Sequence, residues 1–473
     1  MYKLKFLSLI ILVALISCKA PLIFEHKNAQ IIPATYDKKN DNTNMADLKW
    51  KDFFTDPYLQ TLIDTALVNN VEILTTLQEI EMAKNNIAIK KSFLKPSVSA
   101  GVGLGIDKAG RYTATGAGNA STEITDGKGV PEPITDILLG LKTTWEVDIW
   151  HKLRNAKKGA LLKYLKTVEG KNFVITNLVA EIANSYYELL ALDNQLEIIR
   201  ETIQLQKNEL EIVKVQKEAA KATELGVKQF EAQVYNLQGD EYDVLQNITE
   251  AENKINFLLS RFPQKIDRDK TLLTSKIPMT INEGIPAQLL QNRPDIKQAA
   301  LELQAAKIDV KIAQAEFYPS LGISANLGFQ AFKPKYLFKP LESLAFSVIN
   351  DFAGPIINRT AIKAEFNKAN AVQLEALYDY QKAVVNGYIE VSNEMSNIKN
   401  LQEIQNLKTK EVQTLTKSIS IAKDLFQYAR ATYLEVLIAQ RDALSAKLEL
   451  VETSKKQFNA VTNIYKALGG GWK

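Results

Sequence analysis

The sequence predicts a mixed α and β membrane protein in which a duplicated unit supplies four β-strands and two long helical hairpins. Three observations lead to this fold class. The second half of the chain repeats the first, four segments alternate between apolar and polar residues, and two long stretches lack proline. Each alternating segment has about the length that a tilted strand needs to cross a bilayer. Four half-buried strands of a soluble sheet are the alternative, because alternation alone does not reject it.

The internal repeat is a tandem duplication. Residues 69–98 align without a gap on residues 292–321, at an offset of about 223. Residues 222–227 align on residues 431–436, at an offset of about 209. The difference of about 14 residues is an insertion in the first repeat, which we assign to a loop between residues 96 and 153 because loops tolerate changes in length. We therefore expect repeats over residues 50–261 and 291–473, joined by a linker over residues 262–290.

The N-terminus has the form of a secretory signal, which we assign to residues 1–17. Two lysines precede an apolar core of about eleven residues, too short for a transmembrane helix. Cys18, the single cysteine of the chain, follows at once and resembles the lipidated residue of a bacterial lipobox. We expect a covalent lipid at Cys18; a small buried thiol is the alternative. Residues 18–49 lack sustained periodicity and are expected to form an extended tether.

The strands are expected at about residues 97–107, 137–149, 320–330 and 343–353, each with one apolar face. Four strands cannot close a barrel, and lipid does not tolerate unpaired strand edges, so several protomers must share one barrel. The apolar faces would then contact outer-membrane lipid, and the polar faces would line a wet lumen. The charged residues expected to face that lumen are Lys142, Glu146, Asp148 and Asp351.

The two proline-free stretches are expected to fold as helical hairpins over about residues 152–261 and 362–468. Apolar residues recur there at intervals of three and four, and a single helix of that length would approach 150 Å, at about 1.5 Å per residue. Small and polar residues mark where each stretch reverses. These tip residues are Ala220, Lys221, Thr223, Ala429, Arg430 and Thr432. The glycines at 469–471 are expected to form a flexible exit from the last helix.

Several motifs resemble the outer-membrane factor family of TolC/OprM type, in its lipoprotein branch. They are the strand-to-helix segment 145–154, segments 292–296 and 315–320, and the C-terminal segments 432–440 and 465–472. The resemblance implies a homotrimer whose four strands per chain form a trimeric 12-stranded β-barrel, continued by a long periplasmic α-helical barrel. It further implies a lipid-anchored protein of the bacterial outer membrane that extends into the periplasm.

The function that this resemblance implies is a passive export duct. It would receive substrates from an inner-membrane RND-type pump and a periplasmic adaptor, or membrane fusion protein. The alternative is a periplasmic structural or adaptor lipoprotein that uses its coiled-coil hairpins as a docking scaffold. Four segments with clean apolar and polar faces favour the duct, since a scaffold does not need them.

The family resemblance also implies a periplasmic gate near the second tip. Family members often carry two acidic residues three positions apart; here Glu435 matches the first and Ile438 replaces the second. Three copies of Glu435 would form an acidic ring, and Ile438 would form an apolar constriction. A solvated surface carboxylate is the alternative for Glu435. The position of Glu435 in the first repeat is held by Gly226, and alanines at 220 and 429 replace the family's tip glycine.

Composition argues against other classes of function. The chain has 58 Lys and Arg against 54 Asp and Glu, without a basic patch, so we expect no nucleic-acid partner. Its two histidines, His26 and His151, are far apart in sequence, which leaves no cluster for a metal site or for general-base catalysis. We expect no enzyme activity, no metal and no cofactor apart from the lipid at Cys18.

Overall fold

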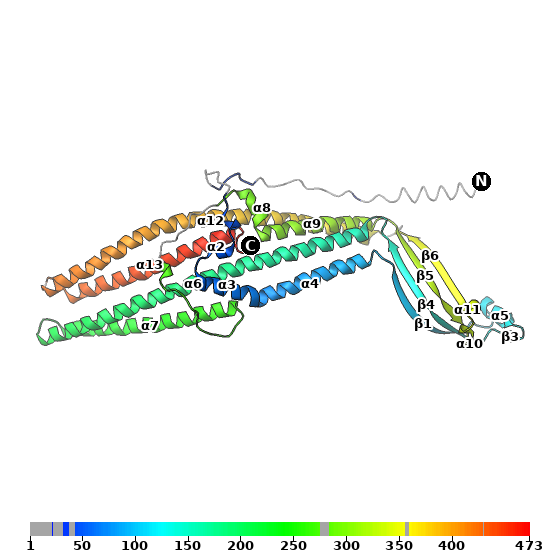
Figure 1. Ribbon diagram of the computed structural model, residues 1–473, viewed down its shortest axis with the longest axis horizontal. Coiled ribbons are helices and arrows are strands. Elements are labelled where there is room, and N and C mark those ends of the chain that lie inside the picture. The colour runs from blue at the N-terminus through cyan, green and yellow to red at the C-terminus, as the bar shows by residue number, and fades with distance from the viewer. Residues whose placement is uncertain (1–20, 22–31, 37–42, 275–282, 355–358, 429) are drawn as a thin grey trace. The chain divides into compact units, whose positions relative to one another are not determined.

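The computed structural model describes residues 21, 32–36, 43–274, 283–354, 359–428 and 430–473 (Figure 1). The signal segment, Cys18, most of the tether and Ala429 lie outside these residues. The chain forms two compact units. The strand unit comprises residues 1–27, 81–165 and 301–378, and the hairpin unit comprises residues 28–80, 166–300 and 379–473.

These two units do not coincide with the two sequence repeats. Each repeat contributes one strand pair to the strand unit and most of one helical hairpin to the hairpin unit. The reason is that like elements pack on like: strands complete a sheet with strands, and long amphipathic helices bury their apolar stripes against other helices. The repeat is therefore a unit of sequence and not of packing.

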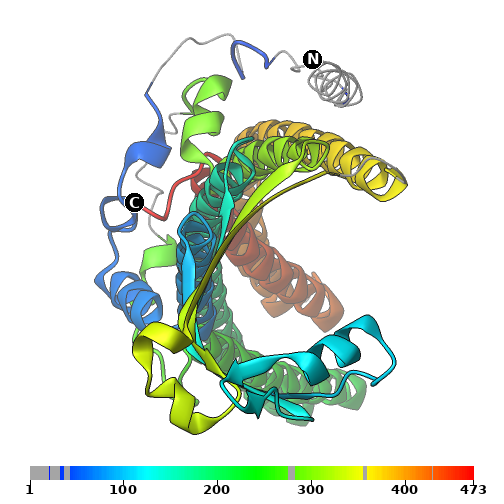
Figure 2. The same cartoon turned by 90° about the vertical axis from the view of Figure 1, so that its right-hand side faces the viewer.

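The strand unit is built on a four-stranded antiparallel sheet in the order β1-β4-β5-β6. Its strands are β1 (Ser97–Asp107), β4 (Ile134–Val147), β5 (Ser320–Ala331) and β6 (Leu344–Ala353). The sheet is strongly curved, as Figure 2 shows. The central pair, β4 and β5, comes from different repeats, so the two strand pairs of the duplication join edge to edge.

Short elements connect the strands of each pair. The insertion of the first repeat holds α5 (Ala114–Ser121) and a small hairpin of β2 (Glu123–Thr125) and β3 (Lys128–Gly129). The second pair is joined by α10 (Pro334–Leu337) and α11 (Pro340–Ser343). α9 (Pro294–Ala315) leads into β5, and its C-terminal part packs in the strand unit through Ala305, Ile308 and Val310.

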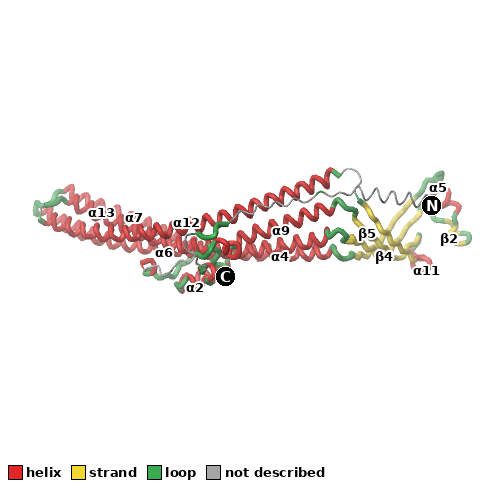
Figure 3. The backbone as a smooth tube through the Cα atoms, turned by 90° about the horizontal axis from the view of Figure 1, so that it is seen from above, coloured by secondary structure: helices red, strands yellow, loops and turns green. Residues whose placement is uncertain are grey.

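The hairpin unit holds most of the four long helices (Figure 3). α6 (Lys152–Glu218) reverses into α7 (Glu224–Leu258), and α12 (Thr360–Gln427) reverses into α13 (Tyr433–Ala467). α6 and α12 both begin in the strand unit. Their apolar faces meet those of α2 (Trp50–Phe53), α3 (Pro57–Asn69) and the start of α4 (Val71–Ser92) in one large core. None of the helices in the described part of the chain is long and apolar enough to cross a membrane.

Buried tyrosines tie the short N-terminal helices to this core. The Tyr186 hydroxyl donates to Asp56 Oδ2 at 2.6 Å, and the same carboxylate accepts from the main-chain N–H of Tyr58 at 2.8 Å and so caps α3. Tyr465 stacks on Phe53, with ring centroids 3.9 Å apart, and donates to the main-chain carbonyl of Leu48. Burial raises the pKa of Tyr465 to about 12, so its hydroxyl stays a donor.

The glycines that follow α13 are packed, and the expectation of a flexible exit is wrong. Residues 468–471 are buried. Gly469 has φ +94°, and a Cβ at Gly470 would lie 2.3 Å from the Tyr465 ring. Trp472 Nε1 donates to the Gly469 carbonyl at 2.9 Å and folds the end of the chain back. Gly469 and Gly470 are there because the main chain passes too close to its neighbours for a side chain, and Gly471 is there because its φ of +100° favours glycine.

Candidate functional site: the sheet faces and the hairpin tips

The two faces of the four-stranded sheet differ sharply, and the strand register brings like residues together. Leu141 of β4 pairs with Ala100 of β1 and with Leu327 of β5, and Leu327 pairs with Phe346 of β6. The apolar face that results is exposed, as is normal for a surface that meets lipid or a partner. Its exposed large apolar members are Val98, Val102, Leu104, Ile106, Leu139, Leu141, Leu327, Leu344, Phe346, Val348 and Phe352.

The opposite face carries small and polar residues in rows that run across the strands. One row is Ser99, Lys142, Asn326 and Ser347. The next row is Gly101, Gly140, Gly328 and Ala345. A hollow of about 550 Å³ lies over these two rows. The polar face is therefore hollowed, as expected for the wall of a water-filled passage.

The glycine row lets the two repeats approach each other where their strand pairs join. A Cβ on Gly140 would lie 2.8 Å from the Leu327 carbonyl oxygen, and one on Gly328 would lie 2.5 Å from the Leu139 carbonyl oxygen. Both contacts are with main chain, so no side-chain movement could relieve them. Glycine at defined positions is a known means of curving a sheet, and this pair stands between the two central strands. Sequence alternation predicts the face of these glycines but does not reveal their close approach.

Three of the four residues expected to face the lumen lie in strands on the polar face. Lys142 and Glu146 belong to β4, and Asp351 belongs to β6, opposite Gly322 of β5. Glu146 forms an ion pair with Lys152 at the start of α6, with Lys152 Nζ and Glu146 Oε1 2.6 Å apart. The polar face thus carries both signs of charge.

The expectation that Asp148 lines the lumen is wrong. β4 ends at Val147, and the Asp148 side chain is only 6% exposed. Its carboxylate accepts from the main-chain N–H groups of Leu153 and Arg154, at 2.8 and 3.0 Å. It therefore satisfies donors that the first turn of α6 leaves unpaired, where a negative charge is also favoured by the helix dipole. The period-two alternation of the sequence continues past Val147, where the strand itself ends.

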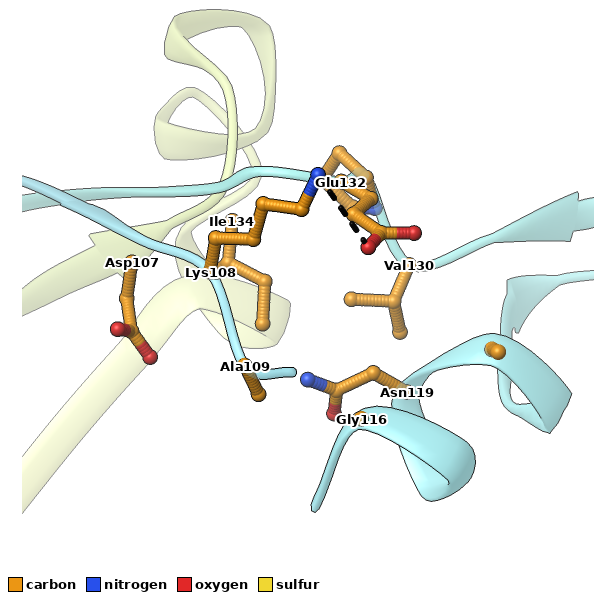
Figure 4. Close-up of a pocket in the computed structure, with 10 residues that line it drawn as sticks. Asp107, Lys108, Ala109, Gly116, Asn119, Val130, Glu132 and Ile134 are labelled. Carbon is orange, nitrogen blue, oxygen red and sulfur yellow. Dashed lines mark ion pairs between the residues drawn. The ribbon is translucent and has the colours of Figure 1, made fainter. Parts of the chain in front are cut away.

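The insertion of the first repeat encloses a small pocket beyond the strands (Figure 4). Lys108 forms an ion pair with Glu132 there, with Nζ and Oε1 3.8 Å apart, and Asn119 and Val130 also line the pocket. Its volume of about 30 Å³ has room for about one water molecule and no larger ligand. We interpret the pocket as packing within a loop.

The first hairpin tip ends α6 with a left-handed residue that is not glycine. Ala220 has φ +57°. Its N–H donates to the Lys217 carbonyl, and the N–H of Lys221 donates to the Gln216 carbonyl at 2.8 Å, which is the Schellman pattern of a helix end. In the second tip the N–H of Arg430 donates to the Leu425 carbonyl at 2.8 Å, over the same spacing. Ala429 lies outside the described residues.

Threonine begins the second helix of each hairpin. The Thr223 hydroxyl accepts from the Gly226 N–H at 3.2 Å. Thr432 is the N-cap of α13, and Glu435 completes its capping box: the Glu435 carboxylate accepts from the Thr432 N–H at 2.5 Å. Glu435 thus has a local structural role, and its part in a gate stays a prediction. Ile438, one turn later, is 40% exposed.

The structure also reveals contacts between the two tips that the sequence does not show. A Cβ on Gly226 would lie 3.2 Å from the ring of Tyr433, so α7 approaches the start of α13 closely. Farther from the tips, Gln206 Nε2 donates to Gln440 Oε1 at 2.8 Å in a buried site, and Lys423 pairs with Glu209 at 2.5 Å. One feature of the sequence hints at the contact of Gly226 with Tyr433. Gly226 and Glu435 occupy the same position of the two repeats and differ, although the leucine before them and the valine after them are the same.

Electrostatics at the first tip also favour the turn. Lys217, in the last turn of α6, pairs with Glu224, in the first turn of α7. The hydrogen bond and charge of Lys217 lower the pKa of Glu224, so this carboxylate stays ionised at the positive end of α7. In the described part of the chain, no group of three or more His, Cys, Asp or Glu side chains is placed to hold a metal ion.

Comparison with known proteins assigns this arrangement to a family. The model of the family described as outer membrane efflux protein matches residues 62–261 and 285–470, more than half of the chain. The chain belongs to the outer membrane efflux protein family. The solvent efflux pump outer membrane protein SrpC of Pseudomonas putida is 26% identical over 425 residues, which cover 90% of this chain and 87% of SrpC. The cation efflux system protein CusC of Escherichia coli is 24% identical over 440 residues, which cover 92% of this chain and 90% of CusC.

Solved structures of efflux channels share the fold. The MtrE outer membrane channel of Neisseria gonorrhoeae superimposes with a TM-score of 0.81 at 20% identity, over 96% of this chain and 98% of MtrE. The fold class expected from the sequence is confirmed: the strands of this efflux protein belong to a β-barrel and its long helices to a helical barrel. The expected function as an outer-membrane efflux channel is likewise confirmed.

Proposed function

We propose that this efflux protein works as a homotrimer whose twelve strands close one barrel. The observation that carries the proposal is the four-stranded sheet, with an exposed apolar face and with β1 and β6 as its two edges. An edge strand in lipid needs a partner for its main-chain groups, and β1 of one protomer can pair with β6 of the next. Threefold closure then leaves no edge.

The trimer would act as a passive duct of a tripartite system. The polar, hollowed sheet face supplies a wet wall, and the long hairpins extend the passage into the periplasm. Substrates would arrive from an inner-membrane RND-type pump through a periplasmic adaptor, and leave without chemical change. We propose no catalysed reaction, in keeping with the role of the family as a channel.

The hairpin tips are the proposed docking surface for adaptor and pump. Ala220, Lys221 and Thr223 are exposed in the first tip, and Arg430 and Thr432 in the second. The helix ends described above fix the main chain at these positions, and the exposed side chains there are of mixed polarity. The gate would lie beside them, with Glu435 as an acidic ring and Ile438 as an apolar one.

A lipid at Cys18 is the proposed anchor. Support comes from Pro21, whose carbonyl accepts from Gln314 Nε2 at 2.9 Å. Gln314 is near the end of α9, six residues before β5 begins at Ser320. Pro21, three residues after Cys18 in the sequence, is thus held at the end of α9 that leads into the sheet. Cys18→Ser should abolish acylation, and an intact mass without a lipid in the unaltered protein would contradict the anchor.

The alternative, a periplasmic scaffold without a barrel, conflicts with the exposed apolar face. Light scattering of the detergent-extracted protein distinguishes the two. Three chains of 52.9 kDa, less the signal segment, give about 150 kDa for the duct. A folded monomer rich in strand would support the scaffold instead.

Arginine substitution tests the two sheet faces separately. Leu141→Arg places a charge on the lipid face and should cost about 2–4 kcal/mol near the membrane midplane. Thr144→Arg, three residues along the same strand but on the polar face, should leave the trimer intact. Loss of trimer in Thr144→Arg alone would mean that the faces are reversed, and equal loss in both variants would mean that the two faces do not differ in environment.

A further inference from the structure

A single positive charge stands in the middle of the polar sheet face. Lys142 of β4 pairs with Ser99 on one side and with Asn326 on the other. Among the described residues, no carboxylate lies within ion-pair distance of the Lys142 ammonium group; the ion pair of this face joins Glu146 to Lys152 instead. The charge of Lys142 is therefore not neutralised by a direct contact.

The rows on either side of the Lys142 row carry no carboxylate. Glu146 is four residues along β4, a main-chain rise of about 13 Å, and Asp136 is six residues in the other direction, a rise of about 20 Å, at about 3.3 Å per residue. Each of these carboxylates moreover has its own partner, since Asp136 accepts from Gln330 Nε2 at 2.9 Å.

The surroundings of Lys142 offer space and hydrogen-bond donors. The glycine row beside it leaves the hollow of about 550 Å³, and no Asp or Glu lines that hollow. Asn326 Nδ2 donates to Ser347 Oγ at 3.1 Å, so the Ser347 hydroxyl already accepts one bond and has its own proton to donate. The Ser99 hydroxyl on the other side of Lys142 donates to the Lys142 carbonyl at 3.3 Å, so Ser347 and the second amide hydrogen of Asn326 are the donors that this row offers. An ammonium group in a row with such donors, without a competing carboxylate, is a site for an anion.

We propose that Lys142 forms an anion-binding ring within the barrel. The inference rests on the proposed trimer: threefold symmetry places three ammonium groups at one level of the lumen, each beside the donors of its own row. A ring of basic side chains selects for anions in a pore. The class of solute that it holds in transit is multivalent anions, such as phosphorylated or polycarboxylated compounds.

Block by inorganic triphosphate tests the ring. The full-length protein is reconstituted in planar bilayers at about 0.15 M KCl, and triphosphate is added on the side of the strand loops. Lys142→Gln should raise the half-blocking concentration by at least about tenfold, whereas Lys142→Arg, which keeps the charge, should change it less than about threefold. Lys128→Gln is the matched control, because it removes the same charge from the β2–β3 hairpin outside the four-stranded sheet.

A second readout does not depend on ion flow. The detergent-solubilised protein is acetylated with an N-hydroxysuccinimide ester, and the modified lysines are quantified by peptide mass spectrometry. Triphosphate should slow acetylation of Lys142 and leave that of Lys128 unchanged.

These experiments distinguish a failure of the proposed anion-binding ring from a failure of the proposed trimeric duct. A monomer in light scattering would overturn the duct, and the ring with it. A trimer in which triphosphate fails to protect Lys142, or in which Lys142→Gln is blocked as readily as the unaltered protein, would overturn the ring alone. Equal loss of block in Lys128→Gln would show a general charge effect and would also overturn the ring.

Discussion

In each repeat, one side chain donates a hydrogen bond to the last carbonyl of the second long helix, but the donor residue differs between the repeats. In the first repeat, Asn70 Nδ2 donates to the carbonyl of Leu258, the last residue of α7, at 2.8 Å. In the second repeat, Arg293 Nη1 donates to the carbonyl of Ala467, the last residue of α13, also at 2.8 Å. The donors are offset by about 223 residues and the acceptors by about 209, the two offsets of the duplication. Each donor satisfies a carbonyl that a helix end leaves unpaired.

The difference between them is charge. Arg293 also pairs with Asp295 and Glu390, each at 2.6 Å, and its positive charge suits the C-terminal end of α13. It fits because Gly387 leaves space: a Cβ there would lie 3.2 Å from Arg293 Nε. Duplication therefore preserved the main-chain acceptor at the helix end, while the donor side chain changed with its surroundings.

The largest effect should come from removing these two donors. Arg293→Ala leaves a buried carbonyl and two carboxylates without their partner and should cost about 3 kcal/mol or more of unfolding free energy. Asn70→Ala removes one buried hydrogen bond and should cost about 1–3 kcal/mol. Urea denaturation of the trimer, followed by tryptophan fluorescence, measures both. Arg441→Ala, which breaks an exposed pair with Asp442, is the control and should cost less than about 1 kcal/mol. If Arg293→Ala and Asn70→Ala lower the free energy of unfolding equally, the charge of Arg293 adds no stability beyond its hydrogen bond.

The next effect concerns the junction between the repeats in the sheet. Gly328→Ala forces a Cβ against the main chain of β4 and should cost about 1–3 kcal/mol. Gly322→Ala is the control on the same face of β5, because its Cβ would lie 3.8 Å from the nearest atom, the Asp351 carbonyl oxygen. Thermal dissociation of the trimer in unboiled gel samples distinguishes them. If both variants dissociate at the same temperature, the close approach of β4 and β5 has no energetic role.

The tips differ in a similar way, because the first repeat has Gly226 where the second has Glu435. Gly226→Glu transplants the second-repeat residue and should cost about 1–3 kcal/mol, since the new side chain meets the Tyr433 ring. In a Tyr433→Ala background the same change should cost much less, which a double-mutant cycle measures by thermal unfolding. Additive losses would place the cause outside this contact.

Glu435 can be tested for its two roles separately. Glutamine also completes a capping box, so Glu435→Gln should change stability by less than about 0.5 kcal/mol. Loss of its charge should reduce cation selectivity in planar bilayers, whereas Ile438→Ala should mainly raise the leak conductance. Unchanged selectivity and conductance in both variants would leave Glu435 as a helix cap and place the constriction elsewhere.

One substitution at the first tip should increase stability instead of reducing it. Ala220 adopts a left-handed conformation that glycine enters without steric cost, so Ala220→Gly should stabilise the first tip by about 0.5–1 kcal/mol. Ala219→Gly, one residue earlier and without a positive φ, should bring no such gain. Hydrogen exchange of the amides at the end of α6 measures the difference, and faster exchange in Ala220→Gly would argue against strain at this turn.

The features that sequence reasoning recovered are those that depend on neighbours within a few residues. Alternation from Val98 to Ile106 predicts which face of β1 is apolar because side chains on a strand point to opposite sides in turn. The tip turns could be located because small and polar residues interrupt the helical pattern there. In the structure Thr223 and Thr432 act locally as well, since each begins a helix at its tip. Such local rules hold before any tertiary contact forms.

The remaining features required partners that are distant in sequence. The Arg293 donor and the Ala467 carbonyl are 174 residues apart, and the close approach of Gly140 to Gly328 arises only when β4 pairs with β5. Asp148 continues the alternation of β4 in sequence, yet it caps α6 because the strand ends one residue earlier. Unpaired helix ends and crowded main chains are satisfied by whichever elements meet there, and that meeting is decided by packing of the whole chain and not by local periodicity.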